Sequence, residues 1–283
     1  MTYKEKNYSV GKTVAFIIPV RHPSNAKNWQ GLLTRLQQTV KSITAQSNPS
    51  WCAVIVANVE AELPSLPDGF HVERVCFSPN PNYDINQGNR EIVYDSFRAD
   101  KGKRVLAGMK AVRYARFFMV VDDDDFVSSD ITAFAVANCD AAGWYFDQGY
   151  VWMEGSRFLF LSSEFNKLCG TSHLVRSDLY KVPEVLDDDS MEYVKAMMGS
   201  HIKMESILKE QGIQLLPLPF VGAIYRVGHM ESHSQWLTQS RNIFRSYLIN
   251  RYTLSRPKLL LRNVMRFRLL DYAKKIQFGM LNN

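Results

Sequence analysis

Four consecutive aspartates follow directly on an apolar run, and their residue type and spacing are well suited to chemistry. The run at 117–121 reads Phe-Phe-Met-Val-Val, and the acids are Asp122, Asp123, Asp124 and Asp125. The run is aromatic and β-branched and too short for a typical helix, so we predict a buried strand. If the strand continues through the acids, Asp122 and Asp124 share one face and Asp123 and Asp125 the other. Carboxylates at the carboxyl end of such a strand suit a hard divalent cation, Mg²⁺ or Mn²⁺, and ligands bind at this edge of open α/β sheets.

A purely structural reading of the acids stays open, in which they form a solvated turn that helps to start the next helix. Ser128, Ser129 and Asp130 precede an apolar segment that begins at Ile131. Ser and Asp favour helix N-caps, which accounts for these three residues. It does not account for four acids placed directly against a buried strand, so we predict a metal and phosphate site there.

Length and composition indicate a globular protein with one large domain or two small ones. The chain has 283 residues and is 46% hydrophobic, which is enough for a sizeable core. The first twelve residues are polar and lack an apolar stretch, so no signal peptide is predicted, and no apolar run is long enough to span a membrane. The widely spaced cysteines are predicted to be buried, reduced thiols of a cytoplasmic protein; they are Cys52, Cys76, Cys139 and Cys169.

The charge is concentrated at the carboxyl-terminal end of the chain. The net charge is +6, yet residues 241–283 contain ten Lys or Arg and a single acid, Asp271. This segment carries a charge of +9, so the rest of the chain carries −3. We therefore predict a mildly acidic body and a strongly basic end.

The first half of the sequence alternates strands and helices. Apolar and β-branched runs predict strands at 14–20, 51–57, 71–77 and 117–121, and helical spacing predicts helices at 29–46 and 105–115. Residues 78–90 are rich in Asn, Pro and Gly and are predicted to form a loop. This order is typical of parallel βαβ units. Neither G-x-G-x-x-G after the first strand nor a P-loop motif occurs, so a dinucleotide site of the Rossmann type and a P-loop are not expected.

The second half is less regular. Residues 150–160 are predicted to form a strand, residues 191–211 a helix broken near Gly199, and residues 215–225 an extended stretch. Residues 244–275 are predicted to form basic helices with apolar stripes.

Several segments of the chain are similar to the motifs of a known family and occur in the same order. They are 16–20, 42–46 followed by 54–56, the basic turn at 100–104, the acids with Val121, the segment 170–176, and Tyr-Arg-Val-Gly-His at 225–229 with Ser232 and Ser234 after it. Together, over about 14–233, the chain resembles the family 2 glycosyltransferases, which have the GT-A fold. The resemblance implies an α/β domain at 1–240 with a Rossmann-like, mostly parallel sheet flanked by helices, followed by a basic helical extension at 241–283.

The resemblance also implies a metal site. Asp124 would hold Mn²⁺ or Mg²⁺, with Asp122 and Asp123 nearby, and His229 would complete the ligands. His233 is the second candidate for this ligand. For either histidine, the alternative is an ordinary hydrogen-bonded imidazole with no role in metal binding. The cation would bridge the phosphates of a nucleoside-diphosphate sugar and neutralise charge as the bond breaks.

Further donor-binding residues are implied by the same matches. Pro19 and Arg21 lie in the loop after the first strand, and Asn58 stands where the family usually has an acid that contacts the base or ribose. Lys101 and Lys103, together with Arg104, would lie against the diphosphate or the base. The alternative for these basic residues is a solvated turn.

The general base is the point at which the sequence departs from the family. The family commonly has Gly-Glu-Asp, whereas this chain has Gly-Ser-His at 199–201, so the resemblance assigns the base to His201. An imidazole suits this role because its usual pKa of about 6.5 lies near working pH. Glu205, one helical turn later, is the next candidate for the base. After it come Asp187, Asp188 and Asp189 as weaker candidates.

The resemblance implies a metal-dependent, inverting glycosyltransferase of the hexosyltransferase type, active in polysaccharide biosynthesis. Its partners would be a nucleoside-diphosphate sugar and a glycan or lipid-linked acceptor. The alternatives are a metal-dependent phosphohydrolase or nucleotidyltransferase, and a nucleotide-sugar-binding module without activity. The basic end predicts peripheral contact with an anionic membrane at its inner face, or else a helix packed on the core, and no nucleic-acid partner is expected.

Overall fold

The computed structural model describes residues 8–83, 89–228 and 255–281 of the chain. Within these ranges the main element is a seven-stranded sheet, with strand order β10-β6-β9-β4-β1-β2-β3. Its strands are β1 (Val14–Pro19), β2 (Trp51–Asn58), β3 (Phe70–Val75), β4 (Phe117–Val120), β6 (Gly143–Tyr145), β9 (His173–Arg176) and β10 (Leu216–Pro217). β3, β2, β1 and β4 are parallel neighbours, β10 is parallel to β6, and only β9 runs against its neighbours. The predicted α/β class with a mostly parallel sheet is confirmed.

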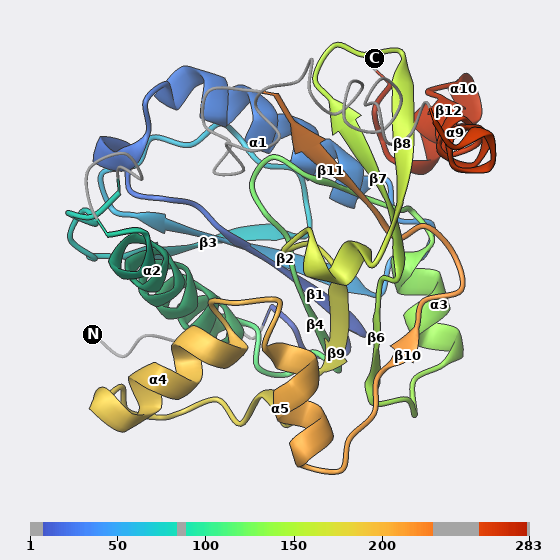
Figure 1. The fold of residues 1–283 in the computed structure, drawn as a ribbon. Helices are drawn as coiled ribbons and strands as arrows, with labels where there is room; N and C mark the ends of the chain where they lie inside the picture. Colours follow the sequence, from blue (N-terminus) through green and yellow to red (C-terminus); the bar gives the residue numbers. More distant parts are fainter. Residues whose placement is uncertain (1–7, 84–88, 229–254, 282–283) are drawn as a thin grey trace.

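Helices cover both faces of this sheet (Figure 1). On one face α1 (Trp29–Thr44) and α3 (Ile131–Ala137) pack against one set of alternating strand residues. On the other face lie α2 (Arg90–Ala111), α4 (Asp188–Met197) and α5 (Met204–Glu210). The alternation follows from the strand period of two, because β1 sends Phe16 to the α1 side and Ile17 to the α2 side.

The helix expected at 105–115 begins much earlier, at Arg90. Asn89 caps it by accepting a hydrogen bond from the backbone N–H of Glu91. The basic turn predicted at 100–104 is therefore wrong: these residues form the middle of α2. Gly102 favoured a turn, but here it permits close packing, since a Cβ would lie 2.9 Å from the carbonyl oxygen of Val194 in α4.

The break predicted in the helix at 191–211 is confirmed. α4 ends at Met197 and α5 begins at Met204. Gly199 lies between them, where a Cβ would be 2.0 Å from the carbonyl oxygen of Arg98 in α2. Asp187 caps α4, so the second acidic run starts a helix.

A second sheet of five strands, which the sequence analysis did not predict, packs beside the first. Its strand order is β12-β8-β7-β11-β5. The strands are β5 (Phe126–Val127), β7 (Gln148–Met153), β8 (Phe158–Ser163), β11 (Ala223–Val227) and β12 (Phe267–Leu269). The single strand predicted at 150–160 is instead the end of β7, a turn at 154–157 and the start of β8, the two strands of an antiparallel hairpin.

The carboxyl-terminal part of the chain joins this second sheet. It contains α9 (Pro257–Val264), β12 and α10 (Tyr272–Gln277), and the strand was not expected. Phe278 is buried with Phe126, Leu159 and Ile224. The division at residue 240 falls outside the described residues and stays a prediction.

Two smaller expectations can be compared with the structure. All four cysteines are free, but Cys76 and Cys139 are exposed, so the prediction of burial holds only for Cys52 and Cys169. Cys76 follows the edge strand β3 and Cys139 follows α3, where the chain leaves the core. Within the described ranges, no helix has the length and apolar character needed to cross a membrane.

Candidate active site

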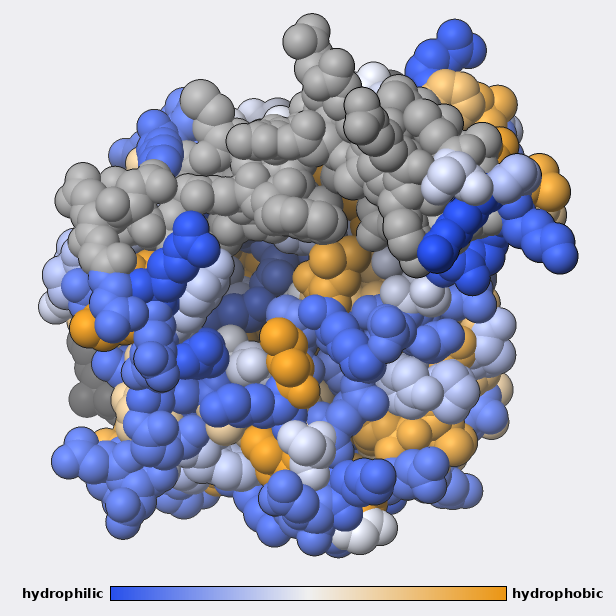
Figure 2. All heavy atoms as spheres, in the orientation of Figure 1, coloured by the Kyte–Doolittle hydropathy of each residue, from blue (hydrophilic) through white to orange (hydrophobic). Residues whose placement is uncertain are grey.

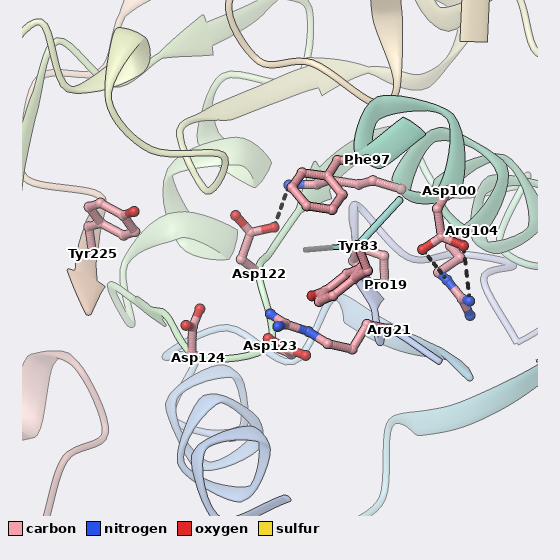
Figure 3. A pocket seen from close by; sticks show the side chains of 11 residues that line it. Pro19, Arg21, Tyr83, Phe97, Asp100, Arg104, Asp122, Asp123, Asp124 and Tyr225 are labelled. Carbon is pink, nitrogen blue, oxygen red and sulfur yellow. Dashed lines mark hydrogen bonds and ion pairs between the residues drawn. The ribbon is translucent and has the colours of Figure 1, made fainter. Parts of the chain in front are cut away.

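A pocket of about 180 Å³ opens at the edge of the seven-stranded sheet where β1 and β4 end (Figure 3). Because β1 and β4 are parallel, their carboxyl ends bring the segments that follow them together. The lining residues are Pro19, Arg21, Tyr83, Phe97, Asp100, Lys101, Arg104, Asp122, Asp123, Asp124 and Tyr225. The predicted acids, Pro19, Arg21 and Lys101 are therefore brought together.

The acids form a turn and do not continue the strand. β4 ends at Val120, and the backbone N–H of Asp125 donates to the carbonyl oxygen of Asp122 at 3.2 Å. The predicted alternation of faces is therefore wrong. Asp122, Asp123 and Asp124 all reach the pocket, because a turn can point consecutive side chains to one side, and Asp125 points into the core.

Asp125 fixes the turn from within. Its carboxylate accepts hydrogen bonds from Thr171 Oγ1 at 2.6 Å and from the backbone N–H of Arg226 at 3.0 Å. Its own carbonyl oxygen accepts from Thr39 Oγ1 of α1. Burial, followed by the charges of Asp124 and Asp122, raises the pKa of Asp125 well above its usual value. This residue holds the turn in shape and does not face the pocket.

Asp122 forms an ion pair with Lys101, which projects from α2. Burial acts to lower the pKa of Lys101, but the charge and hydrogen bond of Asp122 outweigh it and the pKa is raised. Gly170 packs against the pair: a Cβ there would lie 2.5 Å from Asp122 Oδ2 and 2.8 Å from Lys101 Nζ. Any larger residue at 170 would separate the two charges.

Asp123 faces Arg21, as Figure 3 shows. Burial raises the pKa of Asp123 to about 6, the charge of Arg21 opposes this, and the charge of Asp124 adds to it. The guanidinium of Arg21 lies 5.6 Å from the ring centre of Tyr83. Asp123 therefore loses its proton at a higher pH than an ordinary aspartate does.

Asn58 and Lys103 do not line the pocket. The buried amide of Asn58 donates to the carbonyl oxygen of Phe77 at 2.7 Å and accepts from Arg104 Nη1 at 2.8 Å. Arg104 also makes two hydrogen bonds to Asp100, at 3.0 and 3.1 Å. Asn58 thus acts through Arg104, which does reach the pocket.

Two aromatic residues of the pocket, Tyr83 and Phe97, were missed by the sequence analysis, and Tyr225 was quoted only as part of a motif. The rings of Tyr83 and Phe97 meet edge to face with centres 5.1 Å apart, and Tyr225 lies on the far side of the acids. Tyr83 belongs to the segment predicted as a loop and Phe97 to the unexpected first half of α2. Only the correct helix start would have pointed Phe97 toward the acids.

Arg226 was quoted only as part of a motif, and it is a buried cation beneath the acid turn. Its Nη1 donates to Glu154 at 3.3 Å, while Nε and Nη2 have no hydrogen-bond partner among the described residues. Its guanidinium lies 4.5 Å from the ring centre of Phe126. Burial lowers the pKa of Arg226, and the charge of Asp124 is the largest influence that raises it. Arg226 is therefore a buried cation whose charge interacts with Asp124, Glu154 and Asp125.

His201 lies near the Lys101–Asp122 pair but is not one of the described residues that line the pocket. Its Nε2 is 3.4 Å from the carbonyl oxygen of Lys167. Burial, followed by the charge of Lys101, lowers the pKa of His201 to about 4, while Asp122 opposes the shift. The imidazole is therefore neutral at pH 7.

Glu205, the alternative candidate for the base, belongs to a network of polar side chains. Its carboxylate accepts from Asn166 Nδ2 at 2.5 Å and lies 3.1 Å from Nε2 of buried His173. The hydrogen bond with His173 lowers the pKa of Glu205. Both candidate bases therefore have low pKa values, for different reasons.

The oxygen donors suit a hard cation, although the protein alone supplies few of them. Asp122 and Asp124 point into the same space (Figure 3). Across the described residues, no group of at least three His, Cys, Asp and Glu side chains could by itself hold a metal ion. The predicted ligand His229 and its reserve His233 lie outside those residues. Mg²⁺ is commonly held by one or two carboxylates with substrate phosphates supplying the rest, so these residues fit that mode of binding.

The fold and pocket define an α/β protein with an acidic and basic ligand site at the carboxyl edge of its parallel strands. No protein-family model and no curated protein matches the sequence.

Solved structures show a distant likeness. Residues 1–349 of TarS from S. aureus align with 12% identity and a TM-score of 0.40, over 86% of this chain and 77% of that one. A longer TarS structure aligns with 12% identity and a TM-score of 0.37, over 76% of this chain and 37% of that one. A protein from Desulfovibrio desulfuricans G20, described as a nucleotide-diphospho-sugar transferase, aligns with 12% identity and a TM-score of 0.33. The alignment covers 84% of this chain and 100% of that one. These scores are too low to assign a family, so the functional argument rests on the site.

Proposed function

We propose that this protein is a GT-A-like glycosyltransferase that moves a sugar from a nucleoside-diphosphate sugar to a hydroxyl acceptor. One observation carries the proposal: Asp122, Asp123 and Asp124 share a single pocket with Arg21 and Lys101 at the carboxyl edge of parallel strands. Carboxylates beside cations suit a diphosphate bound with a metal ion, and this edge is where α/β sheets bind nucleotides.

The donor is held by charge and by stacking. Arg21 and Lys101 face the diphosphate, since both line the pocket next to the acids. Tyr83 and Phe97 offer ring surfaces to the nucleobase, and stacking of this kind contributes about 1–3 kcal/mol per base. Asn58 supports this side through Arg104, while Pro19 shapes the loop and Lys103 contributes positive charge from the same helix.

Asp122 and Asp124, with His229 as a further ligand, are proposed to hold Mn²⁺ or Mg²⁺. When bound, the ion would supply positive charge to the leaving diphosphate. Lys101 must then share Asp122 with the ion or turn to a phosphate oxygen, and its flexible stem allows either. The charge of buried Arg226 interacts with that of Asp124.

The acceptor hydroxyl attacks the anomeric carbon as the bond to the diphosphate oxygen breaks, and the configuration inverts. The hydroxyl proton passes to His201, which is neutral at pH 7 and therefore has a free lone pair, but whose pKa of about 4 makes it a weaker base than a free imidazole. Glu205 is the alternative acceptor of the proton, and its lowered pKa leaves it as a carboxylate at that pH. The inverting course, the hexosyl donor and a glycan or lipid-linked acceptor follow from the family resemblance.

A screen of UDP-, GDP- and TDP-sugars by thermal shift, with and without Mn²⁺, tests the proposal. A true donor raises the melting temperature by mass action, and more so with the metal. Mass spectrometry then follows donor and acceptor together. Transfer to a hydroxyl is the expected result. Release of sugar phosphate or nucleotide at the same rate without acceptor would indicate a phosphohydrolase, and binding without turnover would indicate a binding module.

A further inference from the structure

The carboxyl-terminal layer exposes an unusual amount of apolar surface. Six large apolar side chains between residues 261 and 276 are 49–70% exposed: Leu261, Val264, Met265, Leu269, Tyr272 and Ile276. The first three are spaced i, i+3 and i+4, so they share one side of α9 and its last turn. Leu269 pairs across the strands with Phe158, which is also 50% exposed. Apolar patches of this kind mark interaction surfaces.

Cations without partners lie among these side chains. Lys258 and Arg262 are on α9 and Lys275 is on α10, and within 8–83, 89–228 and 255–281 none of the three forms an ion pair. The nearby acid, Asp271, is paired with Lys274. We call the six apolar residues with these three cations the C-terminal face. In Figure 2 hydrophobic and hydrophilic side chains lie next to each other at the upper right, over this layer.

A groove continues the C-terminal face toward α1. Two cavities of about 800 and 430 Å³ share Gln38, Lys41, Lys275, Gly279 and Leu281. Their described lining residues include the cations Lys41, Arg157 and Lys275 and no acid. Ile276 and Leu269 of the C-terminal face line one cavity each. The described lining of the groove is therefore partly apolar and partly polar, and its charged residues are all cations.

The C-terminal face is fixed to the body of the protein. β12 pairs with β8, and the backbone N–H of Ser129 donates to the carbonyl oxygen of Gln277 at 2.8 Å. Gly279 packs directly on α1, since a Cβ there would be 2.7 Å from Cα of Ser42. A surface held in this way can dock without first folding.

We propose that the C-terminal face docks on an anionic lipid surface, with lipid phosphate groups entering the groove beside Lys41 and Lys275. Exposed apolar side chains mixed with unpaired cations suit the boundary between anionic headgroups and acyl chains. A linear anionic glycan would use the cations but leave the apolar side chains in water, so the lipid surface fits both features. The proposal does not depend on glycosyl transfer.

Sedimentation of the full chain with vesicles tests this proposal. Vesicles with about 30% phosphatidylglycerol in phosphatidylcholine are compared with phosphatidylcholine alone, because each cation at an anionic surface raises the partition about fivefold. Arg262→Glu/Lys275→Glu is expected to lower the partition at least about 25-fold. Leu261→Ser/Met265→Ser is expected to lower it as well, since the apolar contact is lost. All four side chains are surface residues, and circular dichroism checks the fold.

Matched controls make the outcome decisive. Lys203→Glu/Lys209→Glu changes the charge equally on exposed residues near α5, and Val10→Ser/Val185→Ser removes equally exposed apolar groups elsewhere. Both controls are expected to bind vesicles like the wild type. Equal binding to the two kinds of vesicle, or undiminished binding of the face variants, would overturn the proposal. Binding blocked by inorganic phosphate alone would point to free phosphate, and self-association lost in Leu261→Ser/Met265→Ser without vesicle binding would point to a second copy of the chain.

Discussion

At the scale of single residues, the carboxylates at the pocket interact with nearby positive side chains. Lys101 pairs with Asp122, Arg21 faces Asp123, and buried Arg226 lies beneath Asp124. Neighbouring carboxylates repel one another, so they stay together only with such partners or with a bound cation. This arrangement of charges is the basis for our proposal that the site binds a metal ion together with phosphate.

The sequence revealed the acids and two of the nearby cations as candidates, but not which groups contact which. Four aspartates after an apolar run are visible without a structure, and so are Arg21 and Lys101 as candidates. Asp125 was grouped with the others, because nothing in the sequence says that Thr171 and the backbone of Arg226 will bind it. Contacts between residues far apart in the chain depend on the fold.

His201 should make the protein less stable in mild acid. Its pKa is about 4 in the folded protein and about 6.5 when unfolded, so the unfolded chain binds the proton more readily. Stability is present above the unfolded pKa and is lost as the pH falls from about 6.5 toward about 4. At pH 5 the loss is about 2 kcal/mol. His201→Gln should abolish this loss of stability in acid. Urea unfolding should therefore show that the free energy of unfolding of the variant, relative to that of the wild type, is higher at pH 5 than at pH 7.5. A constant difference between the two proteins would contradict this.

Asp125→Ala should destabilise the fold by about 3 kcal/mol, because the buried donors of Thr171 and the Arg226 backbone lose their acceptor. Urea unfolding measures the change. Asp140→Ala is the control, since the side chain of Asp140 is fully exposed and should cost less than about 0.5 kcal/mol. Equal stability of the two variants would mean that Asp125 does not hold the turn.

At the scale of elements, continuous apolar runs predicted β1, β2 and β4 well because these strands are buried on both faces, and helical spacing predicted α1 because it buries one face. Helical spacing failed for α2, because Asn, Pro and Gly before residue 90 and Gly102 within the helix both favour a turn in a local reading. Packing against α4 outweighs that preference. The error mattered for the site, because the first half of α2 carries Phe97 and Lys101.

Gly199→Ala tests the contact between α2 and the start of the α4–α5 connection. A Cβ at 199 would be 2.0 Å from the backbone oxygen of Arg98, so backbone must move, and we expect a loss of about 2–3 kcal/mol. Chemical denaturation measures it. Gly31→Ala is the control, because its Cβ meets only the side chain of Asn28. A loss no greater at 199 than at 31 would show that the α4–α5 connection does not approach α2 this closely.

At the scale of the whole molecule, the second sheet joins strands that lie far apart in the sequence. β5 follows the acid turn directly, β11 carries Tyr225 and Arg226, and β12 comes from the basic end. Short strands with few residues and distant partners leave little periodic signal, which explains why this sheet was not predicted. It nevertheless supports one wall of the pocket.

Phe278→Ala should show that the carboxyl-terminal layer is part of the same folding unit. Phe278 is fully buried, so its truncation should cost about 3–4 kcal/mol in one cooperative transition. Thermal unfolding followed by calorimetry measures it. Tyr272→Ala, at a side chain that is 70% exposed, is the control and should change little. A separate early transition in the wild type would mean that this layer unfolds independently.

The central claim is that the acid turn binds a nucleoside diphosphate together with a divalent cation, and calorimetric titration of the donor found by thermal shift tests it most directly. We expect binding by the wild type with Mn²⁺ and a loss of at least about 100-fold in affinity for Asp124→Asn, because a charged ligand of the ion is removed. Asp140→Asn, on the surface, should bind like the wild type. Unchanged, metal-independent binding by Asp124→Asn would contradict the claim.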